Sequence, residues 1–286
     1  MSELPVELFR EILNWVSRNP IDLLNVSLVS RSWWIEARPL LYRDVRVCDL
    51  TRSDRLSDVA DFDGYMPFPS IRLSSSYFLS LCQGGFGPTV RRLYINTVLI
   101  ANAPNVRIAL EHTVKLIELH INVRPHVVHR AAPFSAYMPF PPPFHLQSLC
   151  TNLYDDGEGQ GSFRRFLRDG LPSLRTLFYF GRTFHEPDDF FQGLNRKVTS
   201  LRTNNPRFAM VILRSGIIRH LSFVAMEYRW SIVHSFSGVA TSFPSVVSLQ
   251  VQWLKNAMSL DLLFPNLEYL EGINASNFFV GYMGNN

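Results

Sequence analysis

The sequence predicts an α/β protein in which an N-terminal three-helix module precedes an irregular repeat solenoid built on a parallel β-sheet. Three observations predict this fold class. Apolar residues recur at helical spacing through the first 45 residues, a relaxed L-x-x-L-x-L pattern then recurs eight times, and apolar-Pro-polar turns precede several of its copies. We therefore expect the helical module at 1–45, a connection or irregular first repeats at 46–89, and the solenoid at 90–286.

The composition excludes several classes of protein. The 286 residues are 47% hydrophobic and 18% charged, which is enough apolar material to fill a core. The net charge is +4, and no basic run is long enough to indicate nucleic-acid binding. Three widely spaced cysteines are typical of reduced thiols. We expect neither a signal peptide nor a transmembrane helix, and a cytoplasmic or nuclear location.

The first helix begins at Leu4-Pro5, because proline is well tolerated in a first helical turn. Its apolar residues form two adjacent stripes at helical spacing: Leu8, Ile12, Trp15 and Val16 in one, Phe9 and Leu13 in the other. One stripe can pack inside a small bundle. The other stripe is left without a cover from the helix's own module.

Two further short helices and a strand follow. Asn19-Pro20 ends the first helix, Asp22 opens the second, and Ser30 is placed to cap the third, which Pro39 closes. Val45 and Val47 then alternate as in a strand. About 45 residues rarely fold stably alone, so the module either docks on another protein or caps the domain that follows. Periodicity alone leaves both interpretations open.

The order and spacing of these residues resemble an F-box: Leu4-Pro5-x-Glu7-Leu8, Ile12-Leu13, Asp22-Leu23-Leu24-x-Val26-x-Leu28-Val29-Ser30-Arg31-x-Trp33 and Leu41-Tyr42. Ser30 replaces a common cysteine, and Trp15-Val16 replaces a leucine. The resemblance implies binding to an S-phase-kinase-associated (Skp-type) adaptor, which links F-box proteins to a cullin–RING ubiquitin ligase. The residues that it assigns to the adaptor-binding positions are Leu4, Pro5, Leu8, Ile12, Leu24, Val29 and Trp33.

The remaining chain carries a loose repeat. The middle leucine of the pattern is present in all eight copies, at Leu93, Leu119, Leu149, Leu177, Leu201, Leu221, Leu249 and Leu270. Successive middle leucines are separated by 20 to 30 residues. This pattern resembles leucine-rich repeats, whose units are about 20–29 residues long. The resemblance implies strand–helix units that stack and direct their leucines inward.

Proline turns and helices are expected between the strands. Leu171–Leu174, Phe243–Val246 and Phe264–Leu267 each place an apolar-Pro-polar turn before a strand, and Phe68–Ile71 has the same form. The helix candidates are 53–62, 75–83, 162–169, 206–214 and 230–236. The Pro- and aromatic-rich segment 131–144 is expected to be a spacer loop, and 155–161 an acidic loop. The apolar segment 278–283 is expected either to fold back as a cap or to mark an early end of the repeats.

The variable positions of each strand are expected to face outward and to bind a target protein. The candidates are Arg92, Tyr94, Glu118, His120, Arg175, Phe178, Arg202 and Gln250. Arginine, aromatic and polar side chains together are typical of protein-binding surfaces. The asparagine or cysteine that usually follows the strand in leucine-rich repeats is absent, which predicts irregular repeats closed by other backbone contacts.

No arrangement of residues predicts catalysis, a cofactor or a metal. His120, His126 and His129 lie close in sequence but lack partners at ligand spacing. A hydrolase would need clustered polar residues at strand ends, which the sequence does not provide. The resemblance to F-box proteins implies a non-catalytic substrate receptor of a cullin–RING ubiquitin ligase. The alternative is a repeat scaffold that uses its F-box-like helices only as a cap.

Overall fold

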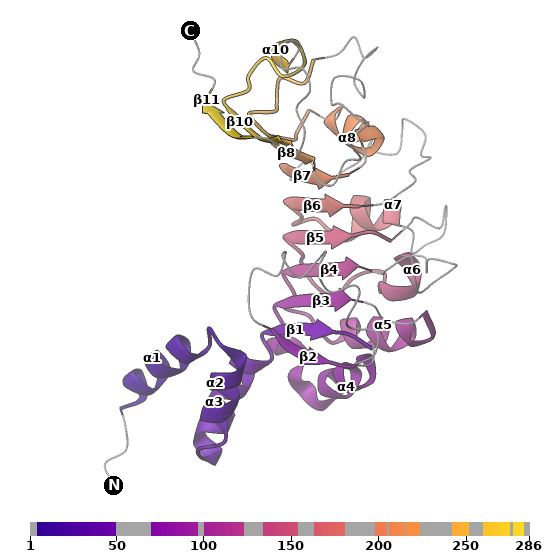
Figure 1. The fold of residues 1–286 in the computed structure, drawn as a ribbon. Coiled ribbons are helices and arrows are strands. Elements are labelled where there is room, and N and C mark those ends of the chain that lie inside the picture. The colour runs from indigo at the N-terminus through magenta and orange to yellow at the C-terminus, as the bar shows by residue number, and fades with distance from the viewer. Residues whose placement is uncertain are drawn as a thin grey trace. The chain divides into compact units, whose positions relative to one another are not determined.

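The computed structural model describes residues 5–49, 70–96, 100–122, 134–153, 163–180, 198–204, 206–214, 216–223, 242–251, 260–274 and 277–282. In Figure 1 the N-terminal helices precede strands that alternate with further helices. The chain divides into two compact units, the first formed by 1–130 and 136–144 and the second by 131–135 and 145–286. The boundaries predicted after residues 45 and 89 lie inside the first unit and stay predictions.

The three N-terminal helices are α1 (Val6–Val16), α2 (Pro20–Ser27) and α3 (Arg31–Leu41), which confirms the predicted helical module. Side-chain caps define where two of them begin. The Asn19 side chain accepts a hydrogen bond from Ile21 N at 3.0 Å, and Ser30 Oγ accepts one from Trp33 N at 3.3 Å. Pro39 does not close α3 as the sequence predicts. The helix continues to Leu41 because Tyr42 N donates to Arg38 O at 3.2 Å, so the last turn closes around the proline.

A mostly parallel sheet follows, as predicted. In the first unit the strand order is β2-β1-β3-β4, with β1 at Asp44–Val47, β2 at Ile71–Leu73, β3 at Arg92–Asn96 and β4 at Glu118–Asn122. In the second unit parallel strands pair in chain order: β5 (Ser148–Thr151), β6 (Thr176–Tyr179), β7 (Ser200–Thr203), β8 (His220–Phe223), β9 (Ser248–Val251) and β10 (Tyr269–Asn274). The last strand, β11 (Asn277–Tyr282), is antiparallel to β10, so this segment folds back on the preceding strand.

Each of the eight middle leucines lies within one of the strands β3 to β10 and is at most 4% exposed. Within each unit the middle leucines of neighbouring strands are register partners, so each strand places its leucine at the same level of its unit's core. Complete burial of one such side chain contributes about 1.5–3 kcal/mol. The sequence pattern therefore located these strands correctly.

The backbone of successive strands is joined by a repeated contact. Arg91 N and Arg92 N both donate to Arg43 O, at 2.8 and 3.1 Å, and the pair of N–H groups that opens β4 donates to Arg91 O in the same way. In the second unit the acceptors are Gln147 O, Arg175 O, Thr199 O, Arg219 O and Val247 O. One carbonyl thus receives two N–H groups from the next repeat. The positions of the missing asparagine, Val98, Arg124, Tyr154, Arg182 and Leu254, lie outside the described residues.

Helices alternate with the strands. Three of the predicted helices are present: α4 (Ser75–Leu81), the short helical segment Phe163–Gly170 that begins with α7 (Phe163–Arg165), and α8 (Pro206–Leu213). The helices predicted at 53–62 and 230–236, and the acidic loop at 155–161, lie outside the described residues. The sequence analysis missed α5 (Ala103–Glu111), α6 (Phe134–Tyr137) and α10 (Leu260–Leu263).

The described part of the Pro-rich segment is packed into the protein, so its prediction as a spacer loop was wrong. Phe134, Tyr137, Met138 and Phe144 are all at most 1% exposed. The buried side chains of this segment are mainly aromatic rings rather than prolines. In the second unit the Phe134 ring centroid lies 5.0 Å from that of Phe163 and 4.9 Å from that of Phe166. These phenylalanines thus fill the core, where aromatic rings bury a large apolar area.

Candidate docking surfaces

The structure separates the two apolar stripes of α1. Leu13 is buried, and the Phe9 ring packs edge-on against Trp33 with 4.4 Å between centroids. On the other side Leu8 is 50% exposed, Ile12 38% and Trp15 74%. Spacings of four and three residues place this second set on one face of the helix. The three side chains therefore form an apolar stripe that the described part of the chain leaves largely open.

Exposed apolar side chains also lie on α2 and on the turn that follows it. Leu23 is buried, whereas Ile21, Leu24, Leu28 and Val29 are exposed. We call these four residues, together with Leu8, Ile12 and Trp15, the apolar helical face. Exposed apolar side chains in such number are typical of a surface that another protein covers. Its chemistry suits the burial of apolar side chains and offers no group for catalysis.

The predicted adaptor-binding residues lie in three different environments. Leu8, Ile12, Leu24 and Val29 belong to the apolar helical face, and Pro5 is exposed just before α1. Trp33 is only partly exposed because it packs against Phe9. Leu4 lies outside the described residues. The sequence analysis did not assign Trp15, Ile21 or Leu28, although their apolar character was visible in it.

A cluster of aromatic and arginine side chains connects α3 to the first repeat. The Arg38 guanidinium lies over the Phe86 ring, 3.4 Å from its centroid, and the Tyr42 ring is 5.7 Å from the same ring. Burial raises the pKa of Tyr42, and its neighbour Tyr77 adds to this effect. Because a cation over a ring and buried aromatic rings attract one another, these contacts hold α3 against the first repeat.

A second surface is the outer face of β1 to β4, where the side chains opposite the core emerge. Their register defines two rows. The first row contains Asp44, Arg92 and Glu118 on β1, β3 and β4. The second row contains Arg72, Arg46, Tyr94 and His120 on β2, β1, β3 and β4. Charged and aromatic side chains from strands that are far apart in sequence are thus brought side by side.

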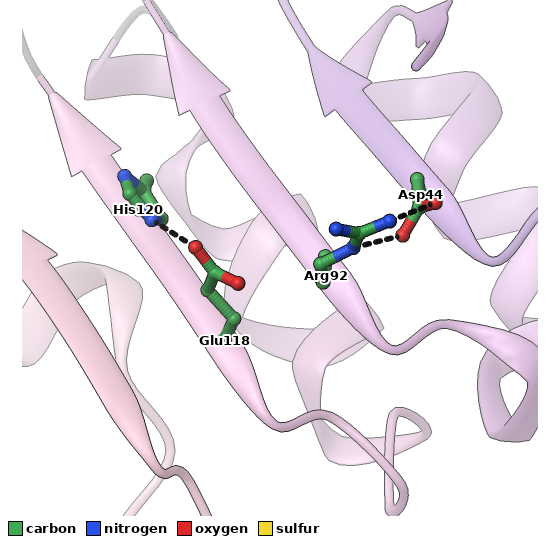
Figure 2. A network of polar contacts seen from close by, with 4 residues as sticks. All are labelled: Asp44, Arg92, Glu118 and His120. Carbon is green, nitrogen blue, oxygen red and sulfur yellow. Dashed lines mark hydrogen bonds and ion pairs between the residues drawn. The ribbon is translucent and has the colours of Figure 1, made fainter. Parts of the chain in front are cut away.

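Asp44 and Arg92 form a two-pronged ion pair across β1 and β3 (Figure 2). Arg92 Nε donates to Asp44 Oδ1 at 2.5 Å, and Arg92 Nη2 donates to Asp44 Oδ2 at 2.6 Å. These hydrogen bonds raise the pKa of Arg92, and the charges of Asp44 and Glu118 act in the same direction. The planar guanidinium matches the carboxylate, so this pair has a fixed geometry.

Glu118 and His120 form a second pair on β4 (Figure 2). His120 Nε2 lies 2.8 Å from Glu118 Oε1, and the His120 ring stacks on Tyr94 with 4.3 Å between centroids. The hydrogen bond with His120 lowers the pKa of Glu118, and the charges of His120 and Arg92 assist it. Tyr94 is only 6% exposed beneath this stack. Of the four predicted target-binding residues in this unit, Tyr94 therefore offers the least surface.

Because the pKa of Glu118 is lowered, we expect this residue to contribute to the fall of the free energy of unfolding in acid. A carboxylate whose pKa is lower in the folded than in the unfolded protein stabilises the fold above its ordinary value of 4.5. That contribution is lost as the pH falls through the lowered folded pKa. Glu118→Gln should therefore flatten the fall of unfolding free energy below pH 4.5, measured by urea denaturation at several pH values. The control is Glu111→Gln, at the exposed end of α5; identical profiles for both variants would contradict the prediction.

The second unit carries the other four predicted target-binding residues. Arg175 is exposed just before β6, and Phe178 and Arg202 are register partners on β6 and β7, with the guanidinium 5.8 Å from the ring centroid. Burial lowers the pKa of Arg202, although the charge of Glu271 opposes this. Gln250 accepts a hydrogen bond from Ser222 Oγ at 2.7 Å and donates to Glu271 Oε2 at 3.0 Å. Among the described strand residues, this face carries fewer charged side chains than that of the first unit.

The sequence analysis missed three residues of the outer face, Asp44, Arg46 and Arg72. The alternation of Val45 with Val47 could have predicted that Asp44 and Arg46 face outward. The turn at 68–71 could have predicted the strand β2 that carries Arg72. Among the described residues there is no group of three or more side chains suited to a metal ion, and no helix long and apolar enough to cross a membrane. His126 and His129 lie outside these residues.

Comparison with known proteins identifies the first part of the chain. Residues 1–33 match the family model of the F-box domain, and this range includes α1, α2 and the apolar helical face. No curated protein matched the sequence. F-box domains bind Skp-type adaptors, and F-box proteins are generally non-catalytic. The match therefore supports a general role in substrate recognition by ubiquitin ligases of the Skp–cullin–F-box type.

Proposed function

We propose that this chain is a substrate-recognition subunit of a cullin–RING ubiquitin ligase in the cytoplasm or nucleus. The apolar helical face docks on a Skp-type adaptor, which connects the chain to the cullin. The following strands and helices form an irregular leucine-rich-repeat solenoid whose outer face binds a target protein. Ubiquitin transfer is carried out by other subunits, and this chain contributes by raising the local concentration of the target.

The observation that carries the proposal is the position of the apolar helical face. It lies within the segment that matches the F-box domain, and its leucine, isoleucine and tryptophan side chains are exposed although the same helices bury Leu13 and Leu23. A solvent-exposed face of this kind costs solubility unless a partner covers it. The repeat pattern of eight buried leucines and the repeated carbonyl contact support the solenoid part of the proposal.

Reconstitution tests this function directly. The full chain, purified together with a Skp-type adaptor, should elute with it from a size-exclusion column as one complex, and addition of a cullin should shift the whole complex to larger size. A well-folded chain that fails to bind the adaptor would exclude the ligase function. It would leave a repeat scaffold that is capped by its own helices.

A further inference from the structure

The turns into β6, β7 and β8 each present two outward residues. Each pair lies between two buried apolar residues, as Leu174 and Leu177 show for the pair that opens β6. Two arginines and one histidine of these pairs are exposed, and three hydroxyl residues are partly exposed. We call these six residues of the second unit the arginine–hydroxyl patch: Arg175, Thr176, Thr199, Ser200, Arg219 and His220.

Backbone contacts hold the patch in a row. Arg175 O accepts hydrogen bonds from Thr199 N at 2.9 Å and from Ser200 N at 3.1 Å. Thr199 O accepts in the same way from Arg219 N at 2.8 Å and from His220 N at 3.0 Å. Because neighbouring strands are about 4.8 Å apart, the backbones of the two arginines are separated by roughly 10 Å. The guanidinium groups are therefore carried on either side of a short row of hydroxyl groups.

The described residues leave the positive charge of the patch without a counterion. Within the described ranges, neither Arg175 nor Arg219 forms an ion pair or a side-chain hydrogen bond. The carboxylates of this face lie further along it. Glu268 occupies the equivalent turn two strands beyond Arg219, and Glu271 on β10 accepts a hydrogen bond from β9. Charge complementarity therefore favours an acidic partner at the patch.

An extended acidic peptide suits this arrangement. One guanidinium matches one carboxylate through two parallel hydrogen bonds, so two separate arginines favour two carboxylates. In an extended chain, alternate side chains project from the same face about 7 Å apart, and the long arginine side chains can span the remaining difference. The hydroxyl groups of Thr199 and Ser200 lie between the arginines, where they can donate to or accept from the peptide backbone.

We propose that the arginine–hydroxyl patch binds an extended acidic segment of the target protein, with the carboxylates of alternate residues on Arg175 and Arg219. This inference rests on the proposed function, because it names the chemistry of the target. A nucleic acid suits the patch less well. Its phosphate charges are continuous, and they would extend toward the carboxylates of Glu268 and Glu271.

Binding of peptide libraries to the immobilised full chain tests the proposal. Four fluorescein-labelled libraries share random neutral flanks and differ at three central positions: glutamate–serine–glutamate, glutamate–glutamate–serine, glutamine–serine–glutamine and glutamine–phosphoserine–glutamine. We expect the alternating glutamate library to be retained most strongly. Arg175→Gln and Arg219→Gln should each reduce its retention about fivefold, at the upper end for an exposed ion pair. Arg107→Gln, on the exposed side of α5, is the matched control and should leave retention unchanged.

Several outcomes would overturn the proposal. Retention of the alternating glutamate library no stronger than that of the glutamine library would do so, as would retention that neither arginine variant alters. Equal or stronger retention of adjacent glutamates would contradict the placing of one carboxylate on each arginine. Stronger retention of phosphoserine would assign the patch to a phosphorylated target instead. Displacement of bound peptide by a short oligothymidylate, but not by excess unlabelled alternating glutamate peptide, would assign it to nucleic acid.

Adaptor binding is measured in parallel on the same preparations, so that the two proposals fail separately. Selective retention of the alternating glutamate library without adaptor binding would support the acidic-segment site and remove the ligase function. Adaptor binding without selective retention would leave the ligase function and overturn the acidic-segment site.

Discussion

Leu8→Asp and Ile12→Asp should each weaken adaptor binding at least about thirtyfold, as measured by isothermal titration calorimetry. The reason is that each side chain is exposed in the free chain and buried in the proposed complex. An aspartate there would carry an unpaired charge into an apolar interface. Such a change costs at least about 2 kcal/mol when it falls on a residue at the centre of the contact. Because the side chains contribute little to the helical core, the fold should survive.

Asn14→Asp is the matched control for these two variants. It places the same charge on α1, but position 14 faces away from the stripe formed by Leu8, Ile12 and Trp15. Its affinity for the adaptor should stay close to that of the unaltered chain. If the three variants weakened binding equally, a general effect of charge would explain the loss and the assigned face would be incorrect. Circular dichroism of each variant separates lost binding from lost folding.

The sequence pattern was sufficient to predict the strands that carry the repeat. The leucine at the centre of each copy is almost completely buried. A residue that recurs in the sequence therefore marks a position that recurs in the core. The same logic failed for α5 and α6. No helix was predicted at α5, although Pro104 in its first turn is compatible with one, and α6 lies in the Pro-rich segment that was expected to be a loop. Burial of Val106 and Leu110 stabilises α5, and burial of Phe134 outweighs the local preference of the Pro-rich segment.

The surface could be predicted only in part, because register between distant segments is not visible in a local pattern. Arg46 and Arg72 become neighbours across a long stretch of chain, and Asp44 meets Arg92 after a still longer one. The sequence analysis treated Arg92, Glu118 and His120 as free to bind a target. In the structure Arg92 binds Asp44, and His120 binds Glu118. Their direct role in binding stays a prediction.

Gly87→Ala should lower the free energy of unfolding by about 1–3 kcal/mol, because an added methyl group has no room. Gly87 is buried in the turn that precedes β3, where its carbonyl accepts a hydrogen bond from Val90 N at 3.1 Å. A Cβ atom there would lie 2.8 Å from the carbonyl carbon and the Cβ of His112, and still closer to its carbonyl oxygen. His112 caps the C-terminal end of α5, so backbone would have to move to relieve the overlap. The helix and the strand that it supports would then separate.

Gly84→Ala provides the comparison, since it adds the same methyl group a few residues away. The nearest atom to a Cβ at this exposed position is Phe86 Cδ2 at 3.9 Å, which is an ordinary contact. Both variants reduce the conformational entropy of the unfolded chain to the same extent, so their difference in urea denaturation isolates the crowding at His112. Equal stability of the two variants would show that α5 and the turn before β3 are less closely packed than this structure has them. A loss confined to Gly87→Ala would establish that close approach as a constraint on the repeat.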